Sequence, residues 1–243
     1  MPPSAAEYAA AVAQQMLARY GIVMREATGA EDVSGGYSSL YPALKTMEEG
    51  GWIRRGMFVA GMGAAQFAST AAVDMLRSLS REPEEPEVLY LAASDPANPY
   101  GSLLPWPRSG GSDENPAGPH GMARAAGAGV ILLDGQLAAF LRRMNSAIRV
   151  FLPDDEPERS RAAASLARRL AELAAERQGR RSGLLITTIN EKPVGEHFLA
   201  RFLEDAGFVA SAAGFQMRRV MPSTIVMPAE EEDEEEQETA QHA

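Results

Sequence analysis

The amino-acid sequence predicts an α+β fold in two parts, followed by an acidic tail. In residues 1–80, apolar side chains recur at helical spacing in successive segments. From residue 88 onward, short apolar runs separated by turn signals are typical of strands, and amphipathic helical segments are inserted among them. The stretch REPEEPE, residues 81–87, is acidic and rich in proline, which indicates a linker. We therefore expect two domains joined by residues 81–87.

The first part has the element order of a winged helix. Residues 4–20 predict a helix with Ser4 as N-cap and Gly21 at its end, and residues 22–33 can hold a short second helix. SGGYSSLYPALKTMEEGG, residues 34–51, predicts a third helix with Pro42 in its opening turns. Two strands then follow, Trp52–Arg54 and Met57–Ala60, with a turn at Arg55 and Gly56, before a closing helix over residues 69–80.

The second part, residues 88–222, predicts a β-barrel-like module of mixed α/β type. In AGVILLDGQLAAFLRR, residues 128–143, Asp134 and Gly135 between two apolar runs are a strong hairpin signal. Residues 157–178 predict an amphipathic helix. The remaining elements expected in this part are strands at 88–94, 148–153, 183–189 and 212–220 and a helix at 194–208 that contains His197.

The charge of the chain is unevenly distributed. The formal net charge is −10, but AEEEDEEEQETAQHA at the end holds 8 of the 33 acidic residues, which leaves 25 acidic and 23 basic residues elsewhere. A run of like charges repels itself and buries nothing. We expect residues 223–243 to form a disordered acidic tail.

Several classes of site are not supported by the sequence. The chain has no cysteine and three scattered histidines, so we expect no disulfide, no metal site and no bound cofactor. Neither lysine belongs to a phosphate-binding G-x-x-x-x-G-K-[ST] loop, and no G-x-S-x-G elbow occurs, so a catalytic residue stays unassigned. No apolar run approaches a membrane span, and the N-terminus does not resemble a signal peptide, so a cytoplasmic protein without a membrane segment is expected.

Seven residues are candidates for contact with nucleic acid, because hydroxyls and cations suit phosphate. They lie on the third helix, on the wing and on a strand of the second part: Ser38, Ser39, Lys45, Arg54, Arg55, Arg142 and Arg143. Residues 1–79 contain 6 basic and 7 acidic residues, so DNA contact and a protein-packing role both stay open for the winged helix. Likewise, Arg142 and Arg143 fit either a solvated strand face or a groove that follows a DNA backbone.

The loop LAASDPANPYGSLLPWP, residues 91–107, has an unusual composition. Four prolines restrict the backbone, while Tyr100 and Trp106 have a large apolar area to bury. We predict a rigid strap that pins the second module to the winged helix, with Asp95 and Asn98 holding its turn. A catalytic role for Asp95 is the alternative.

Four segments carry a resemblance to a known family. RYGIV, GGYSSLYPALKTMEEGG, RRGMFVAGMGAAQF and DPANPYG followed by LPWP resemble the C-terminal part of the large helicase-related (Lhr) proteins, superfamily 2 DNA helicases of bacteria and archaea. The similarity covers roughly residues 15–220. It implies a winged helix packed on a β-barrel-like module in a DNA-repair protein. The two RecA-like motor domains of that family have no counterpart in these residues. We therefore expect either a fragment of a split or degraded gene or a stand-alone module whose partner is a separately encoded helicase motor.

Three functions follow as hypotheses. The first is a DNA-binding accessory module for single-stranded or forked DNA, without a motor of its own. The second is a DNA glycosylase acting on a damaged or deaminated base, because glycosylase activity is associated with some members of the resembled family. The third is a protein-interaction module, with a homo-oligomer as one form.

Overall fold

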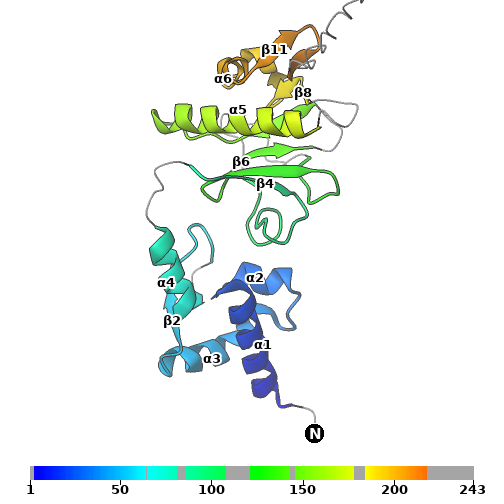
Figure 1. The fold of residues 1–243 in the computed structure, drawn as a ribbon. Coiled ribbons are helices and arrows are strands. Elements are labelled where there is room, and N and C mark those ends of the chain that lie inside the picture. Colours follow the sequence, from blue (N-terminus) through cyan, green and yellow to red (C-terminus); the bar gives the residue numbers. More distant parts are fainter. Residues whose placement is uncertain are drawn as a thin grey trace, which may run out of the picture.

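The computed structural model describes residues 3–63, 65–80, 86–107, 121–142, 146–177 and 184–217. Figure 1 shows the chain rising through successive layers, with the N-terminal helices at one end and the last strands at the other. The helices of the first part are α1 (Ala5–Tyr20), α2 (Arg25–Ala30), α3 (Gly36–Glu49) and α4 (Thr70–Leu79). A small sheet accompanies them, in the order β1 (Ile22–Val23), β3 (Gln66–Ser69) and β2 (Ile53–Gly56). This arrangement is a winged helix.

The limits of α1 confirm the prediction from sequence. The Ser4 hydroxyl accepts a hydrogen bond from the Glu7 N–H, and the Glu7 carboxylate accepts one from the Ser4 N–H, which forms a capping box. At the other end Gly21 has φ 71°, and its Cβ would lie 2.9 Å from Cβ of Ala72. Only glycine satisfies both the left-handed conformation and the close approach of α4.

The core of the winged helix is formed where α1, α3 and β3 meet. Leu44 and Phe67 are fully buried, and the Phe67 ring packs edge-on against Tyr41 with centroids 5.9 Å apart. Pro42 lies in the second turn of α3, beyond the opening turn in which proline is best tolerated.

The wing differs from the prediction. The strand that pairs with β2 is β3, residues 66–69, and not residues 57–60, so Arg55 and Gly56 lie within a strand and not in a turn. The reason is the fully buried side chain of Gln66, which accepts hydrogen bonds from the N–H groups of Phe58 and Val59 and donates one to the Val59 carbonyl. This amide satisfies backbone groups that strand pairing would otherwise have satisfied.

The second part contains a sheet with the order β10-β9-β7-β6-β5-β4. The strands are β4 (Val88–Ala92), β5 (Gly129–Leu133), β6 (Gln136–Leu141), β7 (Ala147–Val150), β9 (Thr188–Ile189) and β10 (Lys192–Pro193). The predicted β5–β6 hairpin is confirmed, with φ 49° at Asp134 and 78° at Gly135. Strands β7 and β9 pair in parallel, and the long helix α5 (Glu158–Arg177) connects them.

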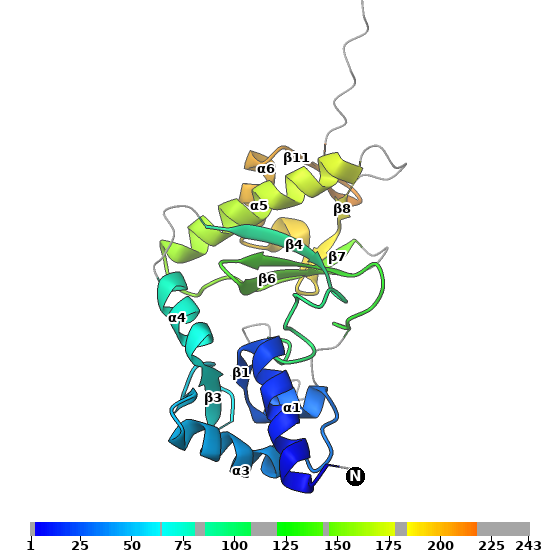
Figure 2. The ribbon, with the colours of Figure 1, turned by 60° about the horizontal axis from the view of Figure 1, so that its bottom comes forward.

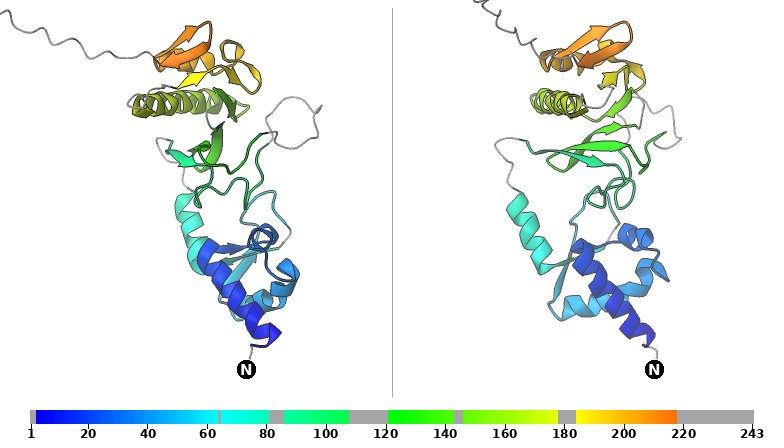
Figure 3. Two further views of the ribbon diagram at one scale, coloured as in Figure 1. Left: turned by 90° about the vertical axis from the view of Figure 1, so that its right-hand side faces the viewer. Right: turned by 45° about the vertical axis from the view of Figure 1, so that its right-hand side comes forward.

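The expected barrel is not found among the described strands, because β10 and β4 are free edges of an open sheet. A parallel pair needs a crossover connection, and here α5 supplies it. Figures 2 and 3 show α5 lying across one face of the sheet. Its buried Leu166, Leu170 and Leu173 join the cluster that includes Leu141 and Ile148. A helix therefore buries the face that would line the inside of a barrel.

A third layer lies beyond α5, as Figure 3 shows. It contains the strands β11 (Phe208–Ser211), β12 (Gly214–Met217) and β8 (Leu185–Ile186), the 3-10 helix η1 (Val194–Glu196) and α6 (Ala200–Asp205). The helix predicted over 194–208 is divided into η1 and α6, because His197 is extended and its Nδ1 accepts the N–H of Leu199. The strand predicted at 183–189 is divided between β8 and β9, which belong to different sheets.

Some predictions lie outside the described residues. They concern the acidic tail at 223–243, residues 81–85 of the linker, and Arg143. Among the helices in the described ranges, none has the length and apolar character to cross a membrane.

The loop over residues 93–107, here called the aromatic loop, is held by side-chain hydrogen bonds. The fully buried amide of Asn98 donates to the carbonyls of Ala93 (2.9 Å) and Tyr100 (3.3 Å) and accepts the N–H of Tyr100 (3.1 Å). The Arg124 guanidinium adds donors to four carbonyls, those of Ser94, Asp95, Asn98 and Tyr100. The Asp95 carboxylate accepts the N–H of Ala97 at 2.8 Å.

The aromatic loop contacts the apolar clusters of both parts. Trp106 lies against Tyr100 and, edge-on, against Phe140 of the large sheet, with ring centroids 6.5 and 5.3 Å apart. Leu103 packs against the core of the winged helix. The strap that the sequence predicts requires contacts of this kind.

Replacing Asn98 by alanine is expected to lower the free energy of unfolding by about 1–3 kcal/mol, because buried backbone groups lose their partners. Urea unfolding followed by circular dichroism measures this effect. Ser102→Ala, in the same loop but exposed, is the matched control and should change the stability little. Equal stabilities for both variants would contradict the role given to Asn98.

Candidate nucleic-acid interface

The first candidate surface, here called the α3–β2 surface, consists of Ser38, Lys45, Trp52, Arg54 and Arg55. Ser38 and Lys45 are seven residues apart on α3, which places them two turns apart on one exposed helix face. Strand β2 follows directly and carries both arginines in exposed positions. The structure therefore groups the predicted residues of the winged helix on two neighbouring elements.

Ser39 holds the start of α3, and its predicted contact with nucleic acid stays a prediction. Its hydroxyl lies 2.9 Å from the carbonyl of Ser34 and 2.8 Å from that of Gly36, so it satisfies the backbone where α3 begins. A Cβ on Gly35 would lie 2.9 Å from Cβ of Ser39, so this start is closely packed. In the described part of the chain, Ser38 makes no side-chain hydrogen bond and keeps its hydroxyl available.

Carboxylates partly neutralise the cations of the α3–β2 surface. Lys45 Nζ lies 3.6 Å from Glu49 Oε1, and Arg55 Nε lies 3.3 Å from Glu48 Oε1. Arg54 forms no ion pair with any residue that the structure describes. Exposed pairs of this kind contribute little free energy, so a phosphate can replace a carboxylate as the partner.

Trp52 was missed by the analysis of the sequence. Its side chain is 70% exposed, next to the Gly50-Gly51 pair that ends α3 and two residues before Arg54. An exposed indole beside cations can stack on an unpaired base. The loop that follows, MFVAGMGAA over residues 57–65, contains no charged residue, so charged contacts come from β2 and α3.

The second candidate surface lies on the face of the large sheet opposite α5. Arg149 pairs with Phe140 across β7 and β6, and Arg142 follows Phe140 by two positions, so the three side chains share this face. A pocket of about 320 Å³ adjoins them. Arg142 donates to the Gly121 carbonyl at 3.1 Å, and Arg149 pairs with Glu191 at 2.5 Å.

The two surfaces are separate. Figures 1 and 2 show α3 at the end of the winged helix that is remote from the large sheet. The structure does not bring Arg142 together with Lys45, Arg54 and Arg55, so a single compact site does not contain all the predicted residues.

Asp95, the alternative catalytic residue, accepts the N–H of Ala97 at 2.8 Å and so holds its own turn. Asp134 in the β5–β6 turn, at φ 49°, accepts the N–H of Glu87 at 2.8 Å. Within the described ranges there is also no group of three or more acidic or histidine side chains that could hold a metal ion. No catalytic residue is assigned.

Comparison with known proteins gives the family context. Residues 2–88 match the family described as "Large helicase-related protein, winged-helix domain". The chain is 41% identical over 182 residues to the "Lhr helicase/ probable uracil glycosylase" of Mycolicibacterium smegmatis, covering 73% of this chain and 11% of that protein. It is 34% identical over 212 residues to the "Lhr helicase/uracil glycosylase" of Escherichia coli strain K12, covering 84% of this chain and 13% of that protein.

The chain thus spans only about a tenth of the length of the curated relatives it matches. Within that span the winged helix, the family match and both relatives agree with the resemblance found in the sequence. The chain is similar to a small region of large helicase-related proteins, and its residues 2–88 match the winged-helix domain of that family.

Proposed function

We propose that this chain is a DNA-binding module of an Lhr-type protein and that it acts together with a helicase motor region. The observation that carries the proposal is the α3–β2 surface of a winged helix from a family of DNA helicases. On this surface a free hydroxyl, three cations and an exposed indole lie on adjacent elements. Hydroxyls and cations suit phosphates, and the indole suits an unpaired base.

The substrate class follows from the same residues. An exposed indole beside cations suits stacking on a base that has left the duplex stack, so single-stranded or forked DNA is the proposed ligand. We assign the cations to the phosphate backbone, where contacts position the protein and carry no direct sequence information. Their partial pairing with Glu48 and Glu49 favours modest affinity with a clear dependence on salt.

A second candidate function is uracil excision, because the names of both relatives include a uracil glycosylase. Those names describe proteins of which this chain matches 11% and 13%. The activity is therefore proposed for the full-length proteins, with this chain contributing DNA contact.

Reversing the charge of Arg54 and Arg55 together, by Arg54→Glu and Arg55→Glu, is expected to weaken binding to single-stranded DNA. Each lost phosphate contact should flatten the plot of log K against log salt by about 0.7, or about 1.4 for the pair. Fluorescence anisotropy over a salt series measures both quantities. Arg77→Glu, an exposed arginine on α4 with its own carboxylate partner, is the matched control. Unchanged affinity and slope in the double variant would remove the wing from the proposal.

Neutralising the competing carboxylates, by Glu48→Gln and Glu49→Gln, should have the opposite effect. Affinity for the same oligonucleotide is expected to rise by about threefold at low salt, with a smaller gain at high salt because the charges are exposed. Glu176→Gln on α5 also removes a carboxylate from an ion pair, but far from this surface, and serves as the control. A rise of equal size in the control would indicate a general charge effect.

The glycosylase candidate is tested by incubating the purified chain with an oligonucleotide that contains one uracil, followed by alkali. The oligonucleotide with thymine at that position is the control. If these residues carry the activity, strand cleavage appears only for uracil. Intact uracil strands in a preparation that binds DNA would restrict the chain to DNA contact.

A further inference from the structure

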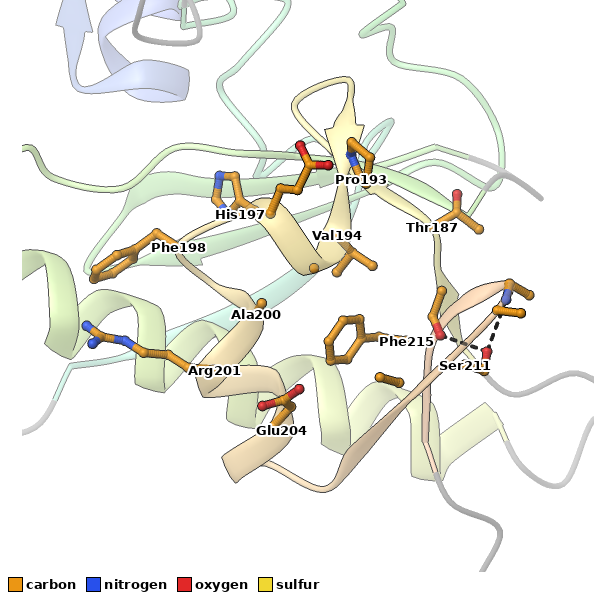
Figure 4. A pocket seen from close by; sticks show the side chains of 16 residues that line it. Thr187, Pro193, Val194, His197, Phe198, Ala200, Arg201, Glu204, Ser211 and Phe215 are labelled. Carbon is orange, nitrogen blue, oxygen red and sulfur yellow. Dashed lines mark hydrogen bonds between the residues drawn. The ribbon is translucent and has the colours of Figure 1, made fainter.

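A pocket in the third layer differs from both surfaces described above. It lies between η1 and α6 on one side and the turn of the β11–β12 hairpin on the other, has a volume of about 780 Å³ and is here called the α6 pocket (Figure 4). Figure 4 shows the ring of Phe215 pointing toward Val194 and Ala200, which gives the pocket an apolar floor. Thr187, Ser211, Arg201 and Glu204 contribute polar groups to its lining.

Two arginines beside the α6 pocket are held by aromatic rings. Arg159 Cζ lies 4.1 Å from the centroid of Phe198, and Arg201 Cζ lies 4.5 Å from Phe198 and 4.6 Å from Phe202. The two rings are themselves in contact, with centroids 5.4 Å apart. A guanidinium over a ring is fixed in orientation while the N–H groups at its edge stay free to donate.

Neither arginine has a carboxylate partner among the described residues, whereas several other cations do. Lys45, Arg55, Arg149 and Arg169 all form ion pairs. In the ranges that the structure describes, neither Arg159 nor Arg201 has an acidic group within 4.0 Å. Their full positive charge is therefore available to a ligand.

The charges around the α6 pocket are mixed. Burial, and then the nearby charges of Arg159 and Lys192, lower the pKa of His197. Glu196 and Glu204 also line the pocket, so it is not suited to a bare anion alone. A ligand that fits must place negative charge near the arginines and an apolar group with N–H donors near Phe215 and Glu204.

We propose that the α6 pocket binds one nucleotide unit of single-stranded DNA, with its phosphate on Arg159 and Arg201 and its base over Phe215. Guanidinium groups bind phosphate oxygens through paired hydrogen bonds, and a base supplies both a flat apolar face and donors for a carboxylate. The volume lies within the range of about 300–1,000 Å³ that small ligands occupy. This inference rests on the proposed DNA-binding function and adds a second contact, remote from the winged helix.

The main test is the double variant Arg159→Gln and Arg201→Gln in the full chain, with binding of a short oligothymidylate measured by fluorescence anisotropy. Affinity is expected to fall about tenfold at 0.1 M salt, and the salt slope should flatten by about 0.7 because the contact with one phosphate is lost. Arg168→Gln replaces an exposed arginine on α5, the helix that carries Arg159. It is the matched control and should behave as wild type. Wild-type affinity and slope in the double variant would overturn the proposal.

A second measurement keeps the test valid if the double variant does not fold. In wild-type protein, NMR signals of Phe198 and Phe215 are expected to shift on titration with thymidine 5′-monophosphate, and to shift much less with thymidine or inorganic phosphate alone. Arg201→Lys keeps the charge and the fold but loses the planar donor pair, so it should weaken the effect. Equal shifts with phosphate alone would overturn the nucleotide assignment.

The outcomes separate this inference from the proposed function. If the Arg54 and Arg55 variant weakens DNA binding and the Arg159 and Arg201 variant does not, the α6 pocket is excluded and the DNA-binding function stands. If the mononucleotide shifts the pocket signals but no oligonucleotide binds, the DNA-binding function and the assignment of the pocket to DNA are both overturned, and a site for a free nucleotide remains. Tighter binding of the matching RNA than of DNA would overturn the choice of DNA.

Discussion

The structure depends on the hydrogen bonds that Asn98 and Arg124 make to the backbone of the aromatic loop. Proline has no N–H to donate and fixes φ, so a loop with four prolines does not pair regularly as a strand and its carbonyls need other donors. Side chains therefore take over this task, one amide from within the loop and one guanidinium from outside it. The result is a fixed loop whose Trp106 lies on the large sheet and whose Leu103 lies on the winged helix.

The crossover from β7 through α5 to β9 has a comparable effect on the second part. It leaves the sheet open and gives it two faces with different coverings. One face carries the aromatic loop together with Arg142 and Arg149, while the other is covered by α5 and then by the third layer. Arg142 and Arg149 are consequently separated by the sheet and α5 from the arginines at the α6 pocket. Among the described arginines of this part, only Arg159 and Arg201 lie over aromatic rings and have no carboxylate partner.

The way each cation is held distinguishes the candidate surfaces more clearly than the number of cations does. On the α3–β2 surface, Glu49 lies one helical turn from Lys45, and Glu48 of α3 pairs with Arg55 of β2. These glutamates reduce the positive charge offered to a ligand. At the α6 pocket, rings orient the guanidinium groups and leave their charge intact. A chain with nearly balanced charge outside its acidic end can therefore still offer local positive sites, which a net charge conceals.

The sequence by itself determined the elements with strong local signals and the family resemblance. Ser4, Glu7 and Gly21 fix α1, Asp134 and Gly135 fix the β5–β6 hairpin, and the segments shared with Lhr proteins identify the relationship. Such features depend on residues close together in the chain, so they can be predicted from the sequence before the tertiary structure is known.

Tertiary structure alone decided what depends on distant residues. The Gln66 amide bonds the backbone of residues 58 and 59, which were expected to form the wing strand. Helix α5 connects a parallel strand pair in an open sheet where a closed barrel was expected, and extended His197 divides the expected helix. Local periodicity does not encode these contacts. The same holds for the candidate sites. Ser38, Lys45, Arg54 and Arg55 could be named in advance because they lie close together in sequence, whereas Arg159 and Phe198 are separated by 39 positions and meet only when α5 packs against the segment before α6.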